Sequence, residues 1–156
     1  MQLETLLTVG RISLDTDVSS KKRALQSLSE LLAESSLELQ EGDVFDSLLA
    51  RERLGTTGLG KGVAIPHGRM ASAKEAYAAV LRLEKGVAYD APDDQPVDLL
   101  IGLVVPEDST EEHLNILACI AELMADEKSL MKIRRASSAD ELHDFIVNNP
   151  CFADQQ

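Results

Sequence analysis

The sequence predicts an α/β fold, a single-domain sandwich in which helices cover the faces of a mixed β-sheet. Residues 97–105 form an apolar run, typical of a strand with both faces covered. Apolar residues at helical spacing occur both before and after that run. No internal repeat, low-complexity segment or linker divides the 156 residues. We therefore expect one domain over residues 1–156, with a core over about 9–149 and a short tail over 150–156.

The first half of the chain predicts two helices between short strands. Alternation over residues 9–14 indicates a strand, and apolar spacing predicts a helix from Ser19 or Ser20 to about residue 32. A second helix is expected over 43–54, with Asp43 as its cap. A strand-like run then covers 63–68.

The second half predicts two further strands and a helical end. Residues 76–83 alternate weakly as a strand, and a turn over 90–96 leads into the apolar strand 97–105. The remaining expected helices run from Ser109 to about Met124, around Leu130 and Ile133, and from a capping box at Ser138 to a stop at Pro150.

Charge and hydropathy exclude several classes of partner. The chain has 15 basic and 27 acidic residues and a net charge of -12, which disfavours nucleic acid and anionic membrane surfaces. Its longest apolar run is far too short to span a membrane, so no membrane insertion is expected. The first residues lack the pattern of a secretory signal, which predicts a cytoplasmic protein.

Cysteine and histidine usage predicts neither a metal site nor a cofactor. Cys119 and Cys151 cannot form a disulfide framework or a four-ligand zinc site alone, and we expect them to be packing or incidental residues rather than reactive ones. The three histidines, His67, His113 and His143, include no pair four residues apart. His143 lies beside acidic residues and is expected to face solvent.

The glycine-dense loop 55–62 is one residue away from a nucleotide-binding P-loop. Gly62 stands where that motif needs a Ser or Thr hydroxyl, and the loop follows a helix and precedes a strand, the reverse of the required order. We expect a turn here, with the framing of a different anion as the alternative.

His67, in the run Ile65-Pro66-His67-Gly68, is the leading candidate for chemistry. Pro66 keeps the preceding residue extended, so His67 is expected at a strand end, with Gly68 leaving room for another molecule to approach. A turn histidine without a role is the alternative. Neutral imidazole is a competent nucleophile when one ring nitrogen is free and the other is hydrogen-bonded.

Positive charge around His67 favours an anionic ligand. Residues 51–69 have a net charge of +3, whereas the rest of the chain has -15. Such a cluster can arise by chance on a surface, but it also suits a transient phosphate near the imidazole. The basic residues are Arg51, Arg53, Lys61 and Arg69.

These residues also form a recognisable pattern. Glu52, six further residues and then Leu-Gly-Lys-Gly-Val-Ala-Ile-Pro-His-Gly over 59–68 resemble the signature of the type-2 IIA proteins of the phosphoenolpyruvate-dependent phosphotransferase system, the mannitol and fructose class. The resemblance extends over about residues 12–148, and residues 53–60 resemble the nitrogen-regulatory branch of that family. It implies the mannitol/fructose-type IIA fold.

The resemblance implies a role for particular residues. His67 would accept a phosphoryl group on Nε2 from an HPr-type carrier, itself supplied by enzyme I and phosphoenolpyruvate. His113 would be the neighbouring histidine that hydrogen-bonds to His67 or to the phosphate. Arg53, in preference to Arg51, would stabilise phosphoryl charge. Regulated partners would include potassium transporters or sensor kinases.

Three alternatives remain open. A sugar-transport IIA component would pass the phosphate to a separate IIB subunit. A protein-interaction module would use the same surface without phosphoryl chemistry. A small hydrolase with His67 as general base would need a nucleophile or metal that the sequence does not supply. In the leading interpretation the chain is a phosphotransferase component with a phosphohistidine intermediate, not a stand-alone turnover enzyme.

Overall fold

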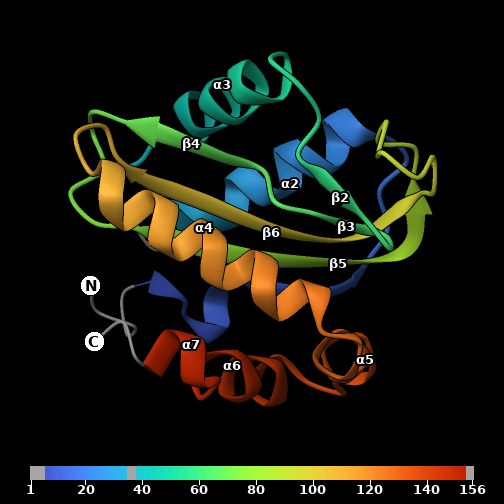
Figure 1. Ribbon diagram of the computed structural model, residues 1–156. Coiled ribbons are helices and arrows are strands. Elements are labelled where there is room, and N and C mark those ends of the chain that lie inside the picture. Colours follow the sequence, from blue (N-terminus) through green and yellow to red (C-terminus); the bar gives the residue numbers. More distant parts are fainter. Residues whose placement is uncertain (1–5, 35–37, 154–156) are drawn as a thin grey trace.

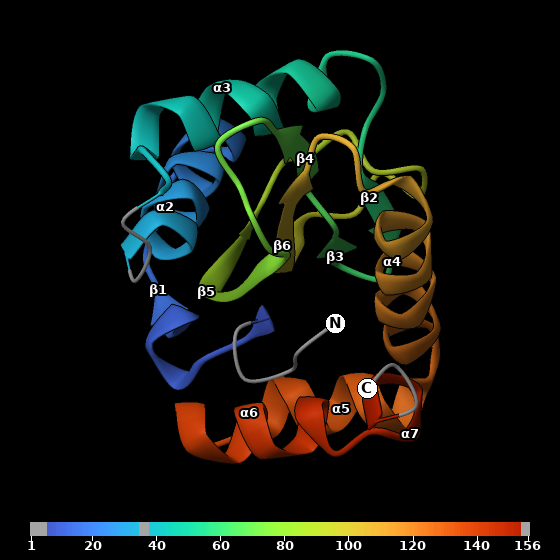
Figure 2. The ribbon, with the colours of Figure 1, turned by 90° about the vertical axis from the view of Figure 1, so that its left-hand side faces the viewer.

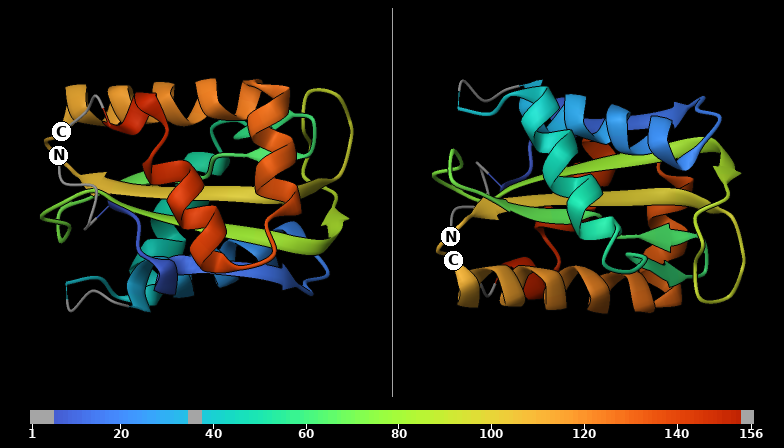
Figure 3. Two further views of the ribbon diagram at one scale, coloured as in Figure 1. Left: turned by 90° about the horizontal axis from the view of Figure 1, so that it is seen from below. Right: turned by 90° about the horizontal axis from the view of Figure 1, so that it is seen from above.

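The structure, a computed structural model, describes residues 6–34 and 38–153 and has three layers (Figure 1). A mixed β-sheet forms the middle layer. Helices α2 (Lys21–Glu34) and α3 (Glu41–Glu52) cover one face, as the view from above shows (Figure 3). The opposite face is covered by α4 (Thr110–Ala125), α5 (Glu127–Arg135), α6 (Ala139–Val147) and α7 (Pro150–Ala153) (Figure 2). The predicted α/β class with helices on both faces is confirmed.

The sheet is mixed because β5 (Tyr77–Val87) and β6 (Val97–Pro106), its two long central strands, pair antiparallel while other pairs are parallel. In order across the sheet, the strands are β1 (Ile12–Thr16), β5, β6, β3 (Val63–Ala64) and β2 (Gly58–Gly60), while β4 (His67–Met70) also pairs with β6. β1 is parallel to β5, and both β3 and β4 are parallel to β6. β2 is antiparallel to β3.

Strand β6 divides the core into two clusters. Leu99, Ile101 and Leu103 pack on the α4 side, whereas Leu100 and Val104 pack on the α2 side. All five are buried, as expected for a strand with helices on both faces. The glycine within this run, Gly102, faces α2, where a Cβ atom would lie 2.6 Å from Leu28 Cδ2. A larger residue would push α2 away from the sheet.

Residues 63–70 follow β6 in one unbroken register. Val63 pairs with Leu99 and His67 with Leu103, so β3 and β4 are two parts of one extended segment. The interruption lies at Pro66, which has no N–H to donate; its carbonyl accepts the Leu103 N–H at 3.0 Å. His67 therefore opens β4, and the prediction that it closes a strand is wrong.

Two local predictions in the first half of the chain also fail. The expected strand over 9–14 begins only at Ile12, because Val9–Arg11 forms a 3-10 turn, η1. There the buried Arg11 donates from Nε to the Ala78 carbonyl and from Nη2 to the Leu6 carbonyl, each at 3.1 Å. The second failed prediction is the turn over residues 55–62, because this glycine loop contains strand β2. In β2 a Cβ on Gly58 would lie only 3.0 Å from the Ala91 Cβ.

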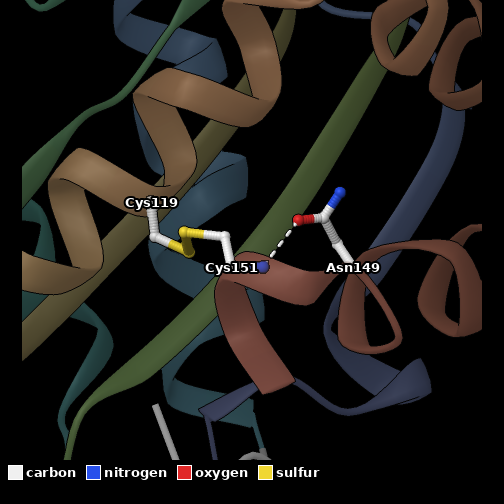
Figure 4. The surroundings of a disulfide bond; sticks show 3 residues. All are labelled: Cys119, Asn149 and Cys151. Atoms are coloured by element: carbon white, nitrogen blue, oxygen red, sulfur yellow. Dashed lines mark hydrogen bonds between the residues drawn. A yellow bond between two sulfur atoms is a disulfide. The ribbon is translucent and has the colours of Figure 1, made fainter. Parts of the chain in front are cut away.

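The first part of the expected tail is packed against the rest of the structure. Residues 150–153 of the expected tail 150–156 form α7, and Phe152 lies in the core at 4% exposure, whereas 154–156 lie outside the described residues. Cys119 of α4 and Cys151 of α7 form a disulfide, and the Cys151 N–H donates to Asn149 Oδ1 at 3.0 Å (Figure 4). The expectation that the cysteines are packing or incidental residues is therefore wrong, since they cross-link two helices.

His143 does not face solvent as predicted. Its Nε2–H donates to the Leu7 carbonyl at 2.9 Å, and the side chain is 22% exposed. This contact joins α6 to the N-terminal segment, which lies 136 residues away in the sequence.

Candidate functional site

His67 is held by a hydrogen bond that fixes its proton. The ring is partly exposed at the start of β4, and Nδ1 lies 2.8 Å from the Ile65 carbonyl oxygen. Because a carbonyl can only accept, Nδ1 carries the proton of the neutral ring. Nε2 then keeps its lone pair, which is the arrangement a nucleophilic imidazole requires.

Gly68 makes room for helix α3. His67 and Arg69 share one side of β4, and Gly68 and Met70 share the other. A Cβ on Gly68 would overlap Ser47 Oγ of α3, whose hydroxyl donates to the Arg69 carbonyl at 3.3 Å. The prediction that Gly68 leaves space for an approaching molecule is therefore wrong; the space is occupied by this chain.

His113 lies against His67. It comes from the first turns of α4, and the two ring centroids are 5.3 Å apart with the planes at 82°, an edge-to-face contact. His113 is 5% exposed, and its Nδ1 is buried without a hydrogen-bond partner in the part of the chain that the structure describes. The structure thus brings together the two histidines that the sequence singled out.

Both rings are held in the neutral form at pH 7. Burial lowers the pKa of His67, the positive charges of Arg51 and Arg69 lower it further, and the Ile65 carbonyl and Glu52 partly oppose the shift. For His113, burial, then His67 and then Arg69 lower the pKa to about 4. The site therefore presents two uncharged imidazoles beside cationic side chains.

The four basic residues of the sequence cluster do not all reach the site. Arg51, in the last turn of α3, donates from Nη1 to the Gly55 carbonyl at 2.9 Å, and its charge acts on His67. Arg53 is the exposed C-cap residue of α3. Lys61 lies at the β2–β3 turn and pairs with Glu127 of α5 at 3.7 Å.

The sequence places Arg69 in the charge cluster but assigns it no role of its own. In the structure it follows His67 on the same side of β4, and its charge lowers the pKa of both histidines. The spacing of two residues along a predicted strand was the signal that could have assigned it to the site.

Glu52 is a buried carboxylate whose charge acts on His67, and the sequence assigns it no role beyond the pattern. It is 7% exposed, accepts the Thr57 N–H at 2.9 Å and the Thr57 hydroxyl, and pairs with Lys21 of α2 at 2.9 Å. The Tyr89 hydroxyl also donates to it, at 3.3 Å. Burial raises the pKa of Glu52, but the Thr57 hydrogen bonds and Lys21 outweigh burial and leave it lowered.

The described part of the chain offers neither a metal site nor a membrane-spanning helix. Among the His, Cys, Asp and Glu side chains that the structure describes, no group of three is placed to hold a metal ion. None of the helices in residues 6–34 and 38–153 is long and apolar enough to cross a membrane.

The chain belongs to the family described as "Phosphoenolpyruvate-dependent sugar phosphotransferase system, EIIA 2", whose profile matches residues 5–149. Within that family it is similar to the nitrogen regulatory protein of Pseudomonas aeruginosa, with 40% identity over 148 residues that cover 95% of this chain and 96% of the relative. It is also 30% identical over 145 residues to the fructose-specific EIIA component of Haloferax volcanii, covering 93% and 94% of the two chains.

Solved structures agree with this assignment. The crystal structure of nitrogen regulatory protein IIA-Ntr from Neisseria meningitidis matches with a TM-score of 0.85 and 44% identity, covering 90% of this chain and 96% of that one. The crystal structure of IIA mannitol from Escherichia coli matches in fold, with a TM-score of 0.74 and 22% identity over 90% and 98% of the two chains. The family resemblance and the IIA fold that it implied are confirmed.

Proposed function

We propose that this chain is a regulatory phosphoryl carrier that accepts a phosphoryl group on Nε2 of His67 from an HPr-type carrier. Partner proteins would then respond to its phosphorylation state. One observation supports this most directly: the Nδ1–H of His67 is bound to the Ile65 carbonyl, so Nε2 is the nitrogen with a lone pair. The similarity to nitrogen regulatory proteins supports the regulatory part.

The transfer balances without moving a proton. The phosphorus–nitrogen bond of the donor histidine breaks as the bond to His67 Nε2 forms, in line. Each imidazole keeps the single N–H it already has, and the donor ring leaves neutral. As the His67 ring becomes positive, its Nδ1–H bond to the Ile65 carbonyl at 2.8 Å strengthens. Positioning and electrostatics are then the main catalytic contributions.

The neighbouring side chains would stabilise the transferring group. We assign this role to Arg51 and Arg69, whose charges already act on His67, rather than to Arg53, which the sequence favoured. His113 is neutral at pH 7 and its Nδ1 is buried, so Nε2–H is the group we assign to hydrogen-bond a phosphoryl oxygen.

Phosphorylation would change the surface that partners meet. A phosphoryl group adds a charge of about -1.5 to -2 at neutral pH, enough to remodel an interface centred on His67. We propose regulated proteins of the nitrogen and potassium systems, such as potassium transporters or sensor kinases, as these partners. A cytoplasmic location follows from the HPr-type donor.

A second candidate is a sugar-transport IIA component that passes the phosphate to a separate IIB subunit. The similarity to a fructose-specific EIIA component favours keeping it. A IIB protein that accepts phosphate from this chain as fast as the HPr-type carrier supplies it would make this second candidate the better one.

The test is incubation with phosphoenolpyruvate, enzyme I and an HPr-type carrier, followed by intact mass and ³¹P NMR. We expect one phosphoryl group, labile in acid and stable in base, that is absent from His67→Gln. His143→Gln is the matched control and should still be labelled, because His143 lies in α6, bonded to Leu7. Label that persists in His67→Gln, or that requires ATP, contradicts the proposal. If regulation persists unchanged in His67→Gln, the chain is an interaction module.

A further inference from the structure

We infer that Glu52 is a positioning residue for His67, because it holds the peptide segment whose carbonyl fixes the Nδ1 proton. This inference deepens the proposed function and rests on it for its meaning. Glu52 lies in the last turn of α3, and the ring of His67 is hydrogen-bonded to the Ile65 carbonyl and not to Glu52, so Glu52 would act through other residues.

Three hydrogen bonds join Glu52 to His67. Glu52 Oε1 accepts the Thr57 N–H at 2.9 Å, the Thr57 carbonyl accepts the Ile65 N–H at 3.0 Å, and the Ile65 carbonyl accepts the His67 Nδ1–H at 2.8 Å. The acceptor in each bond is a carboxylate or carbonyl oxygen, which cannot donate, so the direction of the whole series is fixed. A displaced Thr57 would displace the Ile65 carbonyl with it.

The Glu52 carboxylate is itself immobilised. Lys21 contacts Oε1 at 2.9 Å, and the hydroxyls of Thr57 and Tyr89 both donate to Oε2. Thr57 and Tyr89 also lie within hydrogen-bonding distance of each other at 3.1 Å. A buried carboxylate with this many partners has one position, which it can impose on the loop that follows α3.

The strand itself is anchored independently of Glu52. Beyond Ile65, the Pro66 carbonyl accepts the Leu103 N–H, and β4 stays paired with β6. Loss of the Glu52 contacts should therefore loosen the Ile65 carbonyl without dissociating β4 from the sheet. This separation makes it possible to test positioning apart from folding.

Glu52 also acts on His67 through its charge. Arg51 and Glu52 from α3 and Arg69 from β4 act on the ring through their charges, and His113 from α4 contacts it. Among these four, Glu52 supplies the negative charge, and it raises the pKa of His67 against the arginines. Replacing Glu52 by a residue without its charge, or by a shorter residue with the same charge, should therefore affect His67 differently.

Two substitutions separate these contributions. Glu52→Gln keeps the length of the side chain and removes its charge, so the Nδ1–H form of His67 should persist while its pKa falls. Glu52→Asp keeps the charge but is one methylene too short to hold Thr57. We expect a larger share of the Nε2–H form and transfer slower by about tenfold or more, because small misplacements in such sites are costly. Glu41→Gln, at the exposed start of the same helix, is the matched control.

The measurements are ¹⁵N NMR of the His67 ring against pH, and the rate of phosphorylation by the HPr-type carrier. The inference is overturned if both Glu52 variants are folded and match the parent and Glu41→Gln in tautomer, pKa and rate. If Glu52→Asp does not fold, Thr57→Val takes its place, because it removes the Thr57 hydroxyl bond to Glu52 Oε2 and keeps the charge of Glu52. An unchanged His67 tautomer and transfer rate in that variant would overturn the inference. A parent that no donor phosphorylates contradicts the proposed function instead, while the NMR measurements still decide whether Glu52 positions His67.

Discussion

Replacing His113 should remove a measurable part of the acid sensitivity of the fold. In the folded chain its pKa is lowered to about 4 from an ordinary value of 6.5, chiefly by burial. As the pH falls below 6.5 the unfolded chain takes up a proton on His113 that the folded chain does not. Stability is therefore fully present above 6.5 and is lost toward 4. The loss between pH 8 and pH 5 is about 2 kcal/mol.

Urea unfolding at pH 8 and pH 5 tests this value in the parent and in His113→Gln. The variant will also differ at pH 8, so the quantity that matters is the change between the two pH values. We expect the parent to lose about 2 kcal/mol more than the variant, with m-values unchanged. An equal loss in both proteins would refute the argument, as would an NMR titration of His113 with a midpoint near 6.5.

Three further predictions concern the arginines near His67, the contact between Gly68 and α3, and the disulfide. Arg51→Ala should slow phosphorylation by about tenfold or more, while Arg53→Ala stays within about twofold in the same single-turnover assay; equal effects would remove the distinction between them. Gly68→Ala should destabilise the chain by about 1 to 3 kcal/mol in urea, because the new methyl overlaps Ser47, and adding Ser47→Gly should restore most of this. Cys151→Ser should lower stability under oxidising conditions by about 3 to 4 kcal/mol, since the cross-link closes a loop of 32 residues; a parent and variant of equal stability would show that the disulfide does not restrain the unfolded chain.

The elements that could be predicted are those whose signal is local. Strand β6 is apolar along its length because both of its faces are covered, and the helices around it show their buried faces at helical spacing. His67 could be proposed as the candidate residue because Pro66 and the surrounding charges lie within a few residues of it. In each case the information lies within about one element of the residue concerned.

The features that were missed depend on contacts between distant segments. Strand β2 forms where Gly58 approaches Ala91, and η1 is shaped by the bond from Arg11 to the Ala78 carbonyl. The disulfide required knowing that α7 returns to α4. Residue spacing within a single helix or strand cannot predict such contacts, because the two partners lie in different elements.

The charge cluster illustrates the same limit within the site. Its members are close in sequence but not in their contacts. Lys61, in the β2–β3 turn, pairs with Glu127 of α5, whereas Arg69 lies on β4 two residues after His67. The net charge of residues 51–69 therefore predicts an anion site without showing which cations act on His67, and in the structure these include Arg51 and Arg69.

The charges around His67 act on its two protonation states in opposite ways. Arg51 and Arg69 lower the pKa of the ring, which weakens it as a base but keeps it unprotonated at neutral pH. Since a protonated imidazole has no lone pair on Nε2, this shift enlarges the reactive fraction. In the proposed function the same arginines would attract the phosphoryl group, so one arrangement would favour both the reactive ring and its product. Glu52 opposes them in charge and restores part of the ring's basicity, which is the balance a reversible phosphoryl carrier requires.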